Sequence, residues 1–349
     1  MTDMLQGATA PRANRITFTA TAWSYTKLWY VNVFLTIITL GIYGPWAKVR
    51  NNQYLYGHTS VEHHAFRYLA DPLKILQGRI LALGVILILA AAITFFPLLN
   101  LLTPILMLIA TPWLITQGIR FTMRATSYRN VRFDFKGTTG QTFIYFLLLP
   151  FVSVFTFYLL LPWAIQQLHL YIYRNVEFGG KKVSLETTTG TYYIASILSS
   201  LVSILGAMIA IGFMVGGASI SKETFMTPAI IGPLALILFI SGLLAQAVFI
   251  ARIRNHIINN LTIDEVSTFR SDIGVGGYLW ITATNILLVM VTLGLAFPVA
   301  RIRKLRYLAE HCEAQLHPGI DHLANTVSDT GNAFGEEAAG MMDTDLSII

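Results

Sequence analysis

The chain has 349 residues, of which 54% are hydrophobic and only 12% are charged, and its mean hydropathy is +0.60. Soluble domains carry roughly 25% charged residues, and the few polar residues of this chain could not cover its apolar surface in water. The composition therefore excludes a soluble protein and indicates a multi-pass membrane protein. The net charge of +6 fits contact with a lipid bilayer that has anionic headgroups, and no nucleic-acid partner is predicted.

Seven apolar segments can be placed along the chain, at about 28–47, 79–95, 98–119, 142–168, 191–215, 228–250 and 278–300. Before them, residues 1–27 form a polar N-terminal segment in which 16–22 alternates like a short strand. Residues 28–308 then form a repeated membrane domain. Residues 309–349 contain eight acids and no Lys or Arg, so we expect an acidic, disordered tail. The predicted fold class is mainly α: a polytopic transmembrane helical bundle of about seven apolar segments with internal repeats, plus short β-strands outside the bilayer.

One motif occurs near both ends of the apolar region. Thr39–Tyr56 reads TLGIYGPWAKVRNNQYLY, and Thr292–Ala309 reads TLGLAFPVARIRKLRYLA. The shared glycine and proline are expected to kink the helix as it leaves hydrocarbon. The aromatic and basic residues that follow share one helical face, as suits the headgroup region. These positions are the candidate membrane-exit motif: Gly41, Pro45, Trp46, Arg50, Tyr54, Gly294, Pro298, Arg303 and Tyr307.

Short alternating segments follow several copies of the motif, at residues 130–137, 175–179 and 260–264. Each has the apolar-polar period of a strand. Because single short strands are not stable alone, we expect them to pair with each other outside the bilayer. Repetition of helix, kink and strand predicts an internally duplicated fold.

The stretch from Asn32 to Tyr56, with its core TIITLGIYGPWA and the following Tyr-Leu-Tyr, resembles the signature of the YjgN-like family of bacterial inner-membrane proteins. The other copies and the order of segments extend the resemblance over about residues 14–310. It implies a multi-pass protein of the bacterial inner (cytoplasmic) membrane. The family is a domain of unknown function, so the resemblance implies no catalytic or binding residues.

The 24 Lys and Arg residues permit two topologies. If every exit motif faces the cytoplasm, all of them except Lys222 lie on one side, an extreme positive-inside bias. Segments one, four and seven must then enter and leave on the same side. If all seven segments span, the counts are 15 and 9. Segment length favours seven spans, whereas charge favours one side, and both topologies place the C-terminus in the cytoplasm.

Residues that carry chemistry are sparse. Asn32 and Asn285 lie at matching depths in the first and last apolar segments, and this candidate intramembrane polar pair either bonds neighbouring helices or borders a solute path. His58, His63 and His64 are the densest set of metal-ligand types, but a strand would point His63 and His64 to opposite faces. We predict no metal and no cofactor. Without a catalytic triad or a phosphate-binding loop, we also predict that the protein is not an enzyme.

Two functions fit these observations. In the first, which we favour, the repeated segments surround the path of a channel or transporter for a small solute. In the alternative, the protein is a membrane-embedded scaffold or platform that binds lipid headgroups or a protein partner, with the acidic tail as an arm for that partner. A water-lined centre facing Asn32 and Asn285 would support transport, and a packed centre would support the platform. The sequence does not set an oligomeric state.

Overall fold

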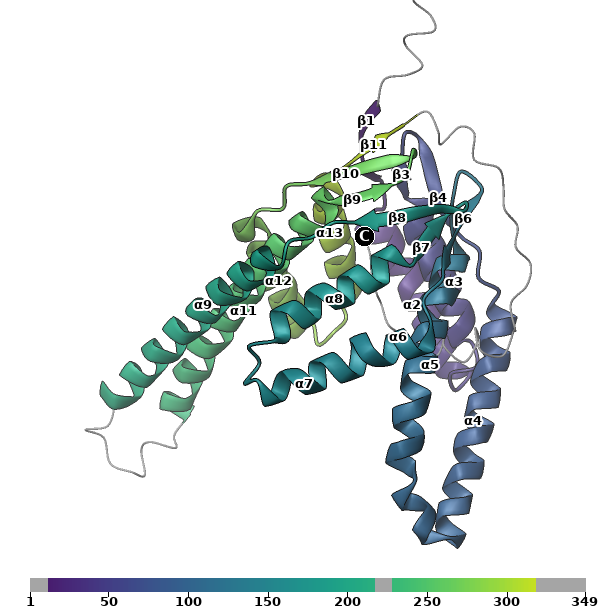
Figure 1. Cartoon of the computed structure of the whole chain (residues 1–349), viewed down its shortest axis with the longest axis horizontal. Helices are drawn as coiled ribbons and strands as arrows, with labels where there is room; N and C mark the ends of the chain where they lie inside the picture. Colours follow the sequence, from purple (N-terminus) through teal and green to yellow (C-terminus); the bar gives the residue numbers. More distant parts are fainter. Residues whose placement is uncertain (1–11, 217–227, 318–349) are drawn as a thin grey trace, which may run out of the picture.

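The structure is a computed structural model that describes residues 12–216 and 228–317. Within those residues one unit occurs five times: a helix runs away from a β-sheet, a second helix returns, and a strand or β-hairpin joins the sheet (Figure 1). The internal repeat predicted from the motif is therefore a repeat of helical hairpins that all begin and end at one sheet.

Short and long hairpins alternate along the chain. The short hairpins are α2 (Ala22–Ile38) with α3 (Gly44–Gly57), then α6 (Thr139–Thr142), the π-helix η2 (Phe143–Leu148) and α7 (Leu149–Phe155) with α8 (Leu161–Arg174), and finally α12 (Val275–Val291) with α13 (Phe297–Glu310). The long hairpins are α4 (Pro72–Phe95) with α5 (Thr103–Ala125), joined by the 3-10 helix η1 (Pro97–Leu101), and α9 (Thr189–Gly216) with α11 (Pro228–Asn259).

The strands of the described residues form one antiparallel sheet in the order β1-β11-β10-β9-β8-β7-β6-β5-β4-β3-β2. They are β1 (Arg12–Arg15), β2 (Thr17–Phe18), β3 (Thr59–Val61), β4 (His64–Tyr68), β5 (Thr126–Tyr128), β6 (Val131–Phe135), β7 (Val176–Phe178), β8 (Lys181–Leu185), β9 (Leu261–Ile263), β10 (Ser267–Ser271) and β11 (Cys312–Leu316). Because only Ile16 separates β1 from β2, the N-terminal stretch pairs with β11 on one side and β3 on the other. This closes the sheet into a barrel-like ring without a long free edge.

Local sequence explains why neighbouring strands pair in chain order. Three hairpins turn through two residues with positive φ, at Glu62–His63, Arg129–Asn130 and Gly179–Gly180, as the favoured two-residue turns require. The predicted strands at 130–137, 175–179 and 260–264 correspond to β6, β7 and β9, and the predicted pairing is confirmed where β6 pairs with β7. The strand expected at 16–22 is shorter, because Thr21 caps α2 by accepting a hydrogen bond from the Ser24 amide.

The three short hairpins share one turn at the end farthest from the sheet. In each tip two consecutive residues adopt positive φ, and a threonine hydroxyl accepts a hydrogen bond from the backbone amide four residues later. A proline at the start of the returning helix costs nothing there, because first-turn amides have no helical partner. The tip residues are Leu40 and Gly41, Phe157 and Tyr158, and Leu293 and Gly294, with Thr39, Thr156 and Thr292 as the hydroxyl acceptors.

This turn gives the residues of the predicted exit motif a structural role. We expected the chain to leave hydrocarbon between Gly41 and Pro45, and that position relative to a bilayer stays a prediction. In the structure α3 returns alongside α2 to the same sheet. The tips expose apolar side chains almost completely, with Leu40 94% and Leu293 91% exposed. The glycine and proline therefore mark the most distant point of a hairpin, where a sharp reversal is needed.

Among residues 12–216 and 228–317, four helices are long and apolar enough to cross a membrane: 72–95, 103–125, 189–215 and 231–259. The predicted count of about seven is not confirmed, because α2 and α12 have 17 residues each and their hairpins begin and end at the sheet. A spanning helix needs about 20 residues. If all seven segments spanned, the β5–β6 and β7–β8 hairpins, which flank the fourth segment, would lie on opposite sides of a bilayer, and β6 could not pair with β7 as it does.

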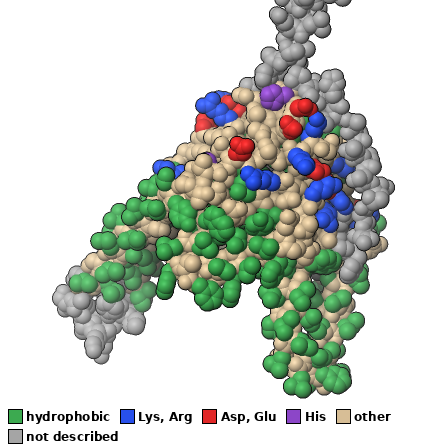
Figure 2. Space-filling model, in the orientation of Figure 1, with side chains coloured by type: hydrophobic (Ala, Val, Ile, Leu, Met, Phe, Trp, Pro, Cys, Tyr) green, Lys and Arg blue, Asp and Glu red, His purple; other side chains and the backbone are tan. Residues whose placement is uncertain are grey.

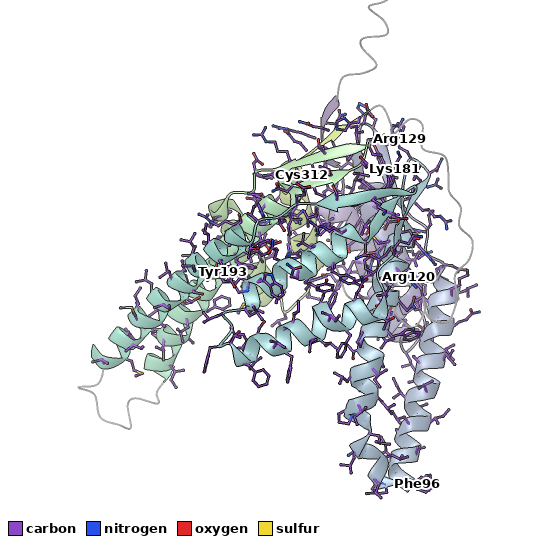
Figure 3. All side chains as sticks on the ribbon, viewed as in Figure 1. Phe96, Arg120, Arg129, Lys181, Tyr193 and Cys312 are labelled. Carbon is purple, nitrogen blue, oxygen red and sulfur yellow. The ribbon has the colours of Figure 1, made fainter. Side chains whose placement is uncertain are left out.

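Charge is segregated along the molecule. The Lys and Arg residues of the described chain lie in the sheet, in the short hairpins, or on the sheet-proximal parts of the long helices, and Lys222 lies outside the described residues. Figure 2 shows the charged side chains gathered at the sheet end and apolar side chains over the projecting helices. Figure 3 places Phe96 at the far tip of the α4–α5 hairpin, with Arg129 and Lys181 at the sheet.

The predicted acidic tail begins later than expected. Residues 309–317 complete α13 and form β11, which lies between β1 and β10. Alternation explains this strand: Cys312, Ala314 and Leu316 are buried, whereas Glu313 and Gln315 between them are partly exposed. Residues 318–349, which hold the other six acids of the tail, lie outside the described residues.

Candidate functional site

The two copies of the predicted exit motif lie side by side. Helix α2 of the first hairpin packs on α13 of the last, where the Tyr30 hydroxyl donates a hydrogen bond to the Leu295 carbonyl (2.9 Å) and Trp29 contacts Phe297. Pro45 and Pro298 are both buried at the start of their returning helices. The first and last hairpins therefore close the ring of helices beneath the closed sheet.

The aromatic and basic residues of the motif are bonded within their own hairpins. Arg50 donates a hydrogen bond to the Tyr43 hydroxyl (2.8 Å), and Tyr43 stacks on Trp46. Tyr54 packs on Tyr25 of α2 with ring centroids 5.5 Å apart. Contact of these groups with lipid headgroups remains a prediction.

In the second copy the matching residues fasten α13 to the preceding helix. Arg303 donates to the Thr284 hydroxyl (3.1 Å), and the Tyr307 hydroxyl donates to the Gly274 carbonyl (3.2 Å). Gly277 allows this approach, because a Cβ there would lie 2.4 Å from the Tyr307 hydroxyl. The motif residues of this copy thus hold the hairpin together.

Asn32 and Asn285 do not face a common space. The Asn32 amide donates to the Asn51 side-chain oxygen (2.9 Å) in α3, and Asn285 donates to the Ala300 carbonyl (2.9 Å) in α13. Asn32 is only 1% exposed. Each asparagine therefore bonds the two helices of its own hairpin, as polar groups in apolar segments commonly do.

The histidines near β3 do not form a metal site. His58 bonds through Nδ1 to the Tyr54 carbonyl (2.6 Å), whereas His63 lies in the β3–β4 turn. Throughout residues 12–216 and 228–317, no group of three His, Cys, Asp or Glu side chains is placed to hold a metal ion.

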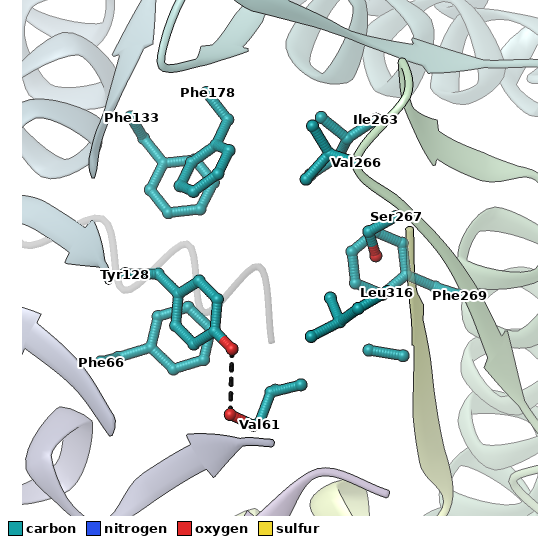
Figure 4. A pocket seen from close by; sticks show the side chains of 11 residues that line it. Val61, Phe66, Tyr128, Phe133, Phe178, Ile263, Val266, Ser267, Phe269 and Leu316 are labelled. Atoms are coloured by element: carbon teal, nitrogen blue, oxygen red, sulfur yellow. Dashed lines mark hydrogen bonds between the residues drawn. The ribbon is translucent and has the colours of Figure 1, made fainter. Parts of the chain in front are cut away.

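An apolar cavity of about 50 Å³ lies inside the barrel-like sheet (Figure 4). Its lining is mostly apolar and includes the rings of Phe66, Tyr128, Phe133 and Phe178, and the Tyr128 hydroxyl is satisfied by donating to the Val61 carbonyl (2.9 Å). Sites for small molecules usually measure 300–1,000 Å³ and contain a few convergent polar groups. This cavity is too small and too apolar for such a ligand, so the barrel interior is a packed core.

Ion pairs fix the outside of the sheet. The Asp134 carboxylate accepts from two cations: Arg124 Nε lies 2.9 Å from Oδ1, and Lys136 Nζ lies 2.6 Å from Oδ2. Partial burial opposes ionisation, but these two hydrogen bonds, a third from the Phe135 amide and the charge of Arg124 together lower the pKa of Asp134. Lys181 of β8 forms an ion pair with Glu265, which lies in the turn between β9 and β10.

Arg254 is a partly buried cation. The Nε atom of Arg254, near the sheet end of α11, is buried without a hydrogen-bond partner among the described residues. The groups that act on Arg254 are Tyr173 of α8, Tyr278 of α12, Cys312 of β11 and Lys304 of α13, and none is a carboxylate. The sequence did not single out Arg254, because it aligns with an ordinary arginine of the repeated motif.

Comparison with known proteins agrees with the motif. A family model described as bacterial protein of unknown function (DUF898) matches residues 13–341. Inner membrane protein YjgN of Salmonella typhimurium is 24% identical over 358 residues, covering 86% of this chain and 88% of the relative. Inner membrane protein YjgN of Escherichia coli K12 is 21% identical over 345 residues, covering 84% and 86%. No solved structure matches the chain. The resemblance seen at Asn32–Tyr56 is thus confirmed, and the chain belongs to the DUF898 family of bacterial proteins of unknown function.

Proposed function

We propose that the protein is a platform embedded in the bacterial inner membrane. Its barrel-like sheet faces the cytoplasm, the α4–α5 and α9–α11 hairpins span the bilayer, and the three short hairpins dip into the cytoplasmic leaflet and return. The C-terminus is then cytoplasmic, because β11 ends at the sheet. The relatives named inner membrane proteins support the location.

The observation that carries this proposal is the segregation of charge. All 24 Lys and Arg residues except Lys222 belong to the sheet side, and cytoplasmic segments carry such an excess of basic residues. The same residues attract the anionic lipids of the cytoplasmic surface, by about 1 kcal/mol for each cation near it. Anionic headgroups are therefore the first partner of the platform. Residues 318–349, with six acids and no base, remain the candidate arm for a protein partner.

The channel or transporter predicted from the sequence has less support. A wet centre facing Asn32 and Asn285 would have supported that function, but each asparagine is bonded within its own hairpin. The barrel interior holds an apolar cavity of about 50 Å³, which offers no polar path to a solute or an ion.

Single cysteines test the arrangement. In a Cys312→Ala background, Asn100→Cys lies at the tip of a long hairpin, Ser184→Cys is exposed on β8, and Leu40→Cys lies at the tip of a short hairpin. With an impermeant maleimide we expect Asn100→Cys to react in intact spheroplasts and Ser184→Cys to react only after lysis. Leu40→Cys should stay unreactive in both, because hydrocarbon surrounds it, and should react in denaturing detergent.

Leu293→Cys is the matched control for Leu40→Cys, since both occupy the same place in the turn. Reaction of either tip from outside would show that the short hairpins span, and the platform would be wrong. Reaction of Ser184→Cys in intact spheroplasts would reverse the topology and have the same consequence.

A further inference from the structure

Two arginines flank a serine in one row across three neighbouring strands. Arg67 of β4 pairs with Ser127 of β5, and Ser127 pairs with Arg132 of β6. Residues paired directly across antiparallel strands lie on the same face of the sheet, with Cβ atoms about 5 Å apart. The residues beside them in the sequence line the apolar cavity inside the sheet: Phe66, Tyr128 and Phe133. The row of Arg67, Ser127 and Arg132 therefore lies on the outer face.

The serine between the two arginines has an unmet hydrogen bond. Ser127 is only 1% exposed, and its Oγ atom has no hydrogen-bond partner among the described residues. A buried polar group without a partner is unfavourable and rare in native proteins. Because a hydroxyl can rotate to donate, an oxygen acceptor held between the two arginines would supply the missing partner.

No acid neutralises the two guanidinium groups within residues 12–216 and 228–317. Arg132 is exposed and its side chain makes no hydrogen bond or ion pair there. Arg67 is also exposed, and its Nη1 atom donates to the uncharged Asn130 side chain (3.1 Å). The acids of the adjoining strands and turns are engaged by Arg124, Arg129, Lys136 or the start of α4: Glu62, Asp71, Asp134 and Glu177.

The hydrogen bond to Asn130 also brings the two cations toward each other. Asn130 lies in the turn between β5 and β6, two residues before Arg132, so the Arg67 guanidinium extends across β5 toward the strand that carries Arg132. Each planar guanidinium binds the oxygens of a phosphate in pairs. Two guanidinium groups and a hydroxyl can together contact several oxygens of a single phosphate group.

We propose that Arg67, Ser127 and Arg132 bind the phosphate group of a small anionic ligand. The site adjoins a long hairpin, because β4 leads into α4 and α5 leads into β5. Ser127 lies two residues beyond the end of α5, about 7 Å along the strand. In the proposed platform this level is cytoplasmic and open to a lipid headgroup or to a soluble phosphate. That placement rests on the proposed function, whereas the phosphate chemistry rests on the side chains.

Thermal unfolding of the full chain in detergent tests the site, because a ligand that binds the folded state raises the unfolding midpoint. The probes are inorganic phosphate and dioctanoyl phosphatidylglycerol at constant ionic strength. Arg67→Gln and Arg132→Gln should each weaken the apparent affinity about tenfold, since each removes charge-assisted hydrogen bonds. Arg270→Gln is the matched control and should change the affinity less than about twofold. Arg270 is an exposed arginine of β10 that pairs across strands with Glu313.

Ser127→Ala tests the buried hydroxyl separately. Because it removes a polar group that has no partner, the ligand-free protein should unfold at an unchanged or higher temperature. Its affinity for the phosphate probe should nevertheless fall. Unchanged affinity in this variant contradicts the proposed site, because the unmet hydrogen bond of Ser127 distinguishes this row from other exposed arginines.

The two probes separate the possible sources of the phosphate. An arginine-dependent response to inorganic phosphate supports the site with a soluble ligand, and a response to phosphatidylglycerol alone supports it with a lipid headgroup. The absence of an arginine-dependent response to both probes, or an equal loss in Arg270→Gln, would overturn the proposal. Cysteine labelling decides the topology independently, so the failure of either proposal can be recognised.

Discussion

His169 of α8 lies against Tyr192 of α9, with its Nδ1 atom 3.0 Å from the tyrosine hydroxyl. Burial lowers the pKa of His169 to about 4, below its ordinary value of 6.5, so the folded protein holds it neutral. The unfolded chain binds the proton first as the pH falls, so stability is lost between about pH 6.5 and 4. Between pH 7 and pH 5 the free energy of unfolding falls by about 2 kcal/mol through this histidine. His169→Gln should remove that share of the acid destabilisation, as measured by unfolding in detergent at both pH values.

His63→Gln provides the comparison, because His63 is exposed in the β3–β4 turn. It should leave the pH dependence of unfolding unchanged. Equal slopes for the wild type and His169→Gln would mean that the buried imidazole contributes nothing to acid sensitivity.

At the scale of elements, the sequence predicts a turn where it carries a recognisable residue. Gly41 and Gly294 mark two of the three hairpin tips. The third tip forms through Phe157 and Tyr158, both with positive φ. Because neither residue is a glycine, the sequence does not indicate a turn there. Strands too are predictable only where the sequence shows an apolar-polar alternation. β5 is three residues long and buried at each of them, so no alternation distinguishes it from the helix before it.

The α9–α11 hairpin is held by close contact between small residues. A Cβ on Gly206 would lie 2.2 Å from the Cβ of Ser241, so the two backbones approach closely here, as small residues permit in membrane helices. We expect Gly206→Val to force the helices apart and destabilise the protein by about 2 kcal/mol or more, since overpacking costs 1–3 kcal/mol. The unfolding midpoint in detergent measures the loss.

Gly212→Val is the internal standard for this change. It lies on the same helix, and no atom lies within 4 Å of the Cβ it would add. The two substitutions alter helix propensity alike, so only the contact with Ser241 separates them. Similar unfolding midpoints for the two variants would show that the close approach does not hold the hairpin.

The whole molecule depends on pairings that local sequence cannot specify. The apolar segments and the repeat are readable because hydropathy and motif spacing are local properties. The closure of the sheet cannot be read from local sequence, because β1 pairs with β11 across about 300 residues. The five hairpins share one sheet only after that closure. Arg254 was missed for the same reason: its lack of an acidic partner is visible only once α8, α11, α13 and β11 are assembled around it.

Two truncations of the full chain test the closure. Ending the chain after His317 keeps β11 and removes only residues outside the described structure, so we expect a monodisperse protein in detergent with a nearly unchanged unfolding midpoint. Ending it after His311 removes β11 and leaves β1 and β10 with free edges, which invite pairing between molecules. This shorter chain should aggregate or elute as larger species in size-exclusion chromatography. If both truncations stay monodisperse, β11 is not the strand that closes the ring. If both aggregate, residues 318–349 stabilise the protein and the acidic segment is more than an arm for a partner.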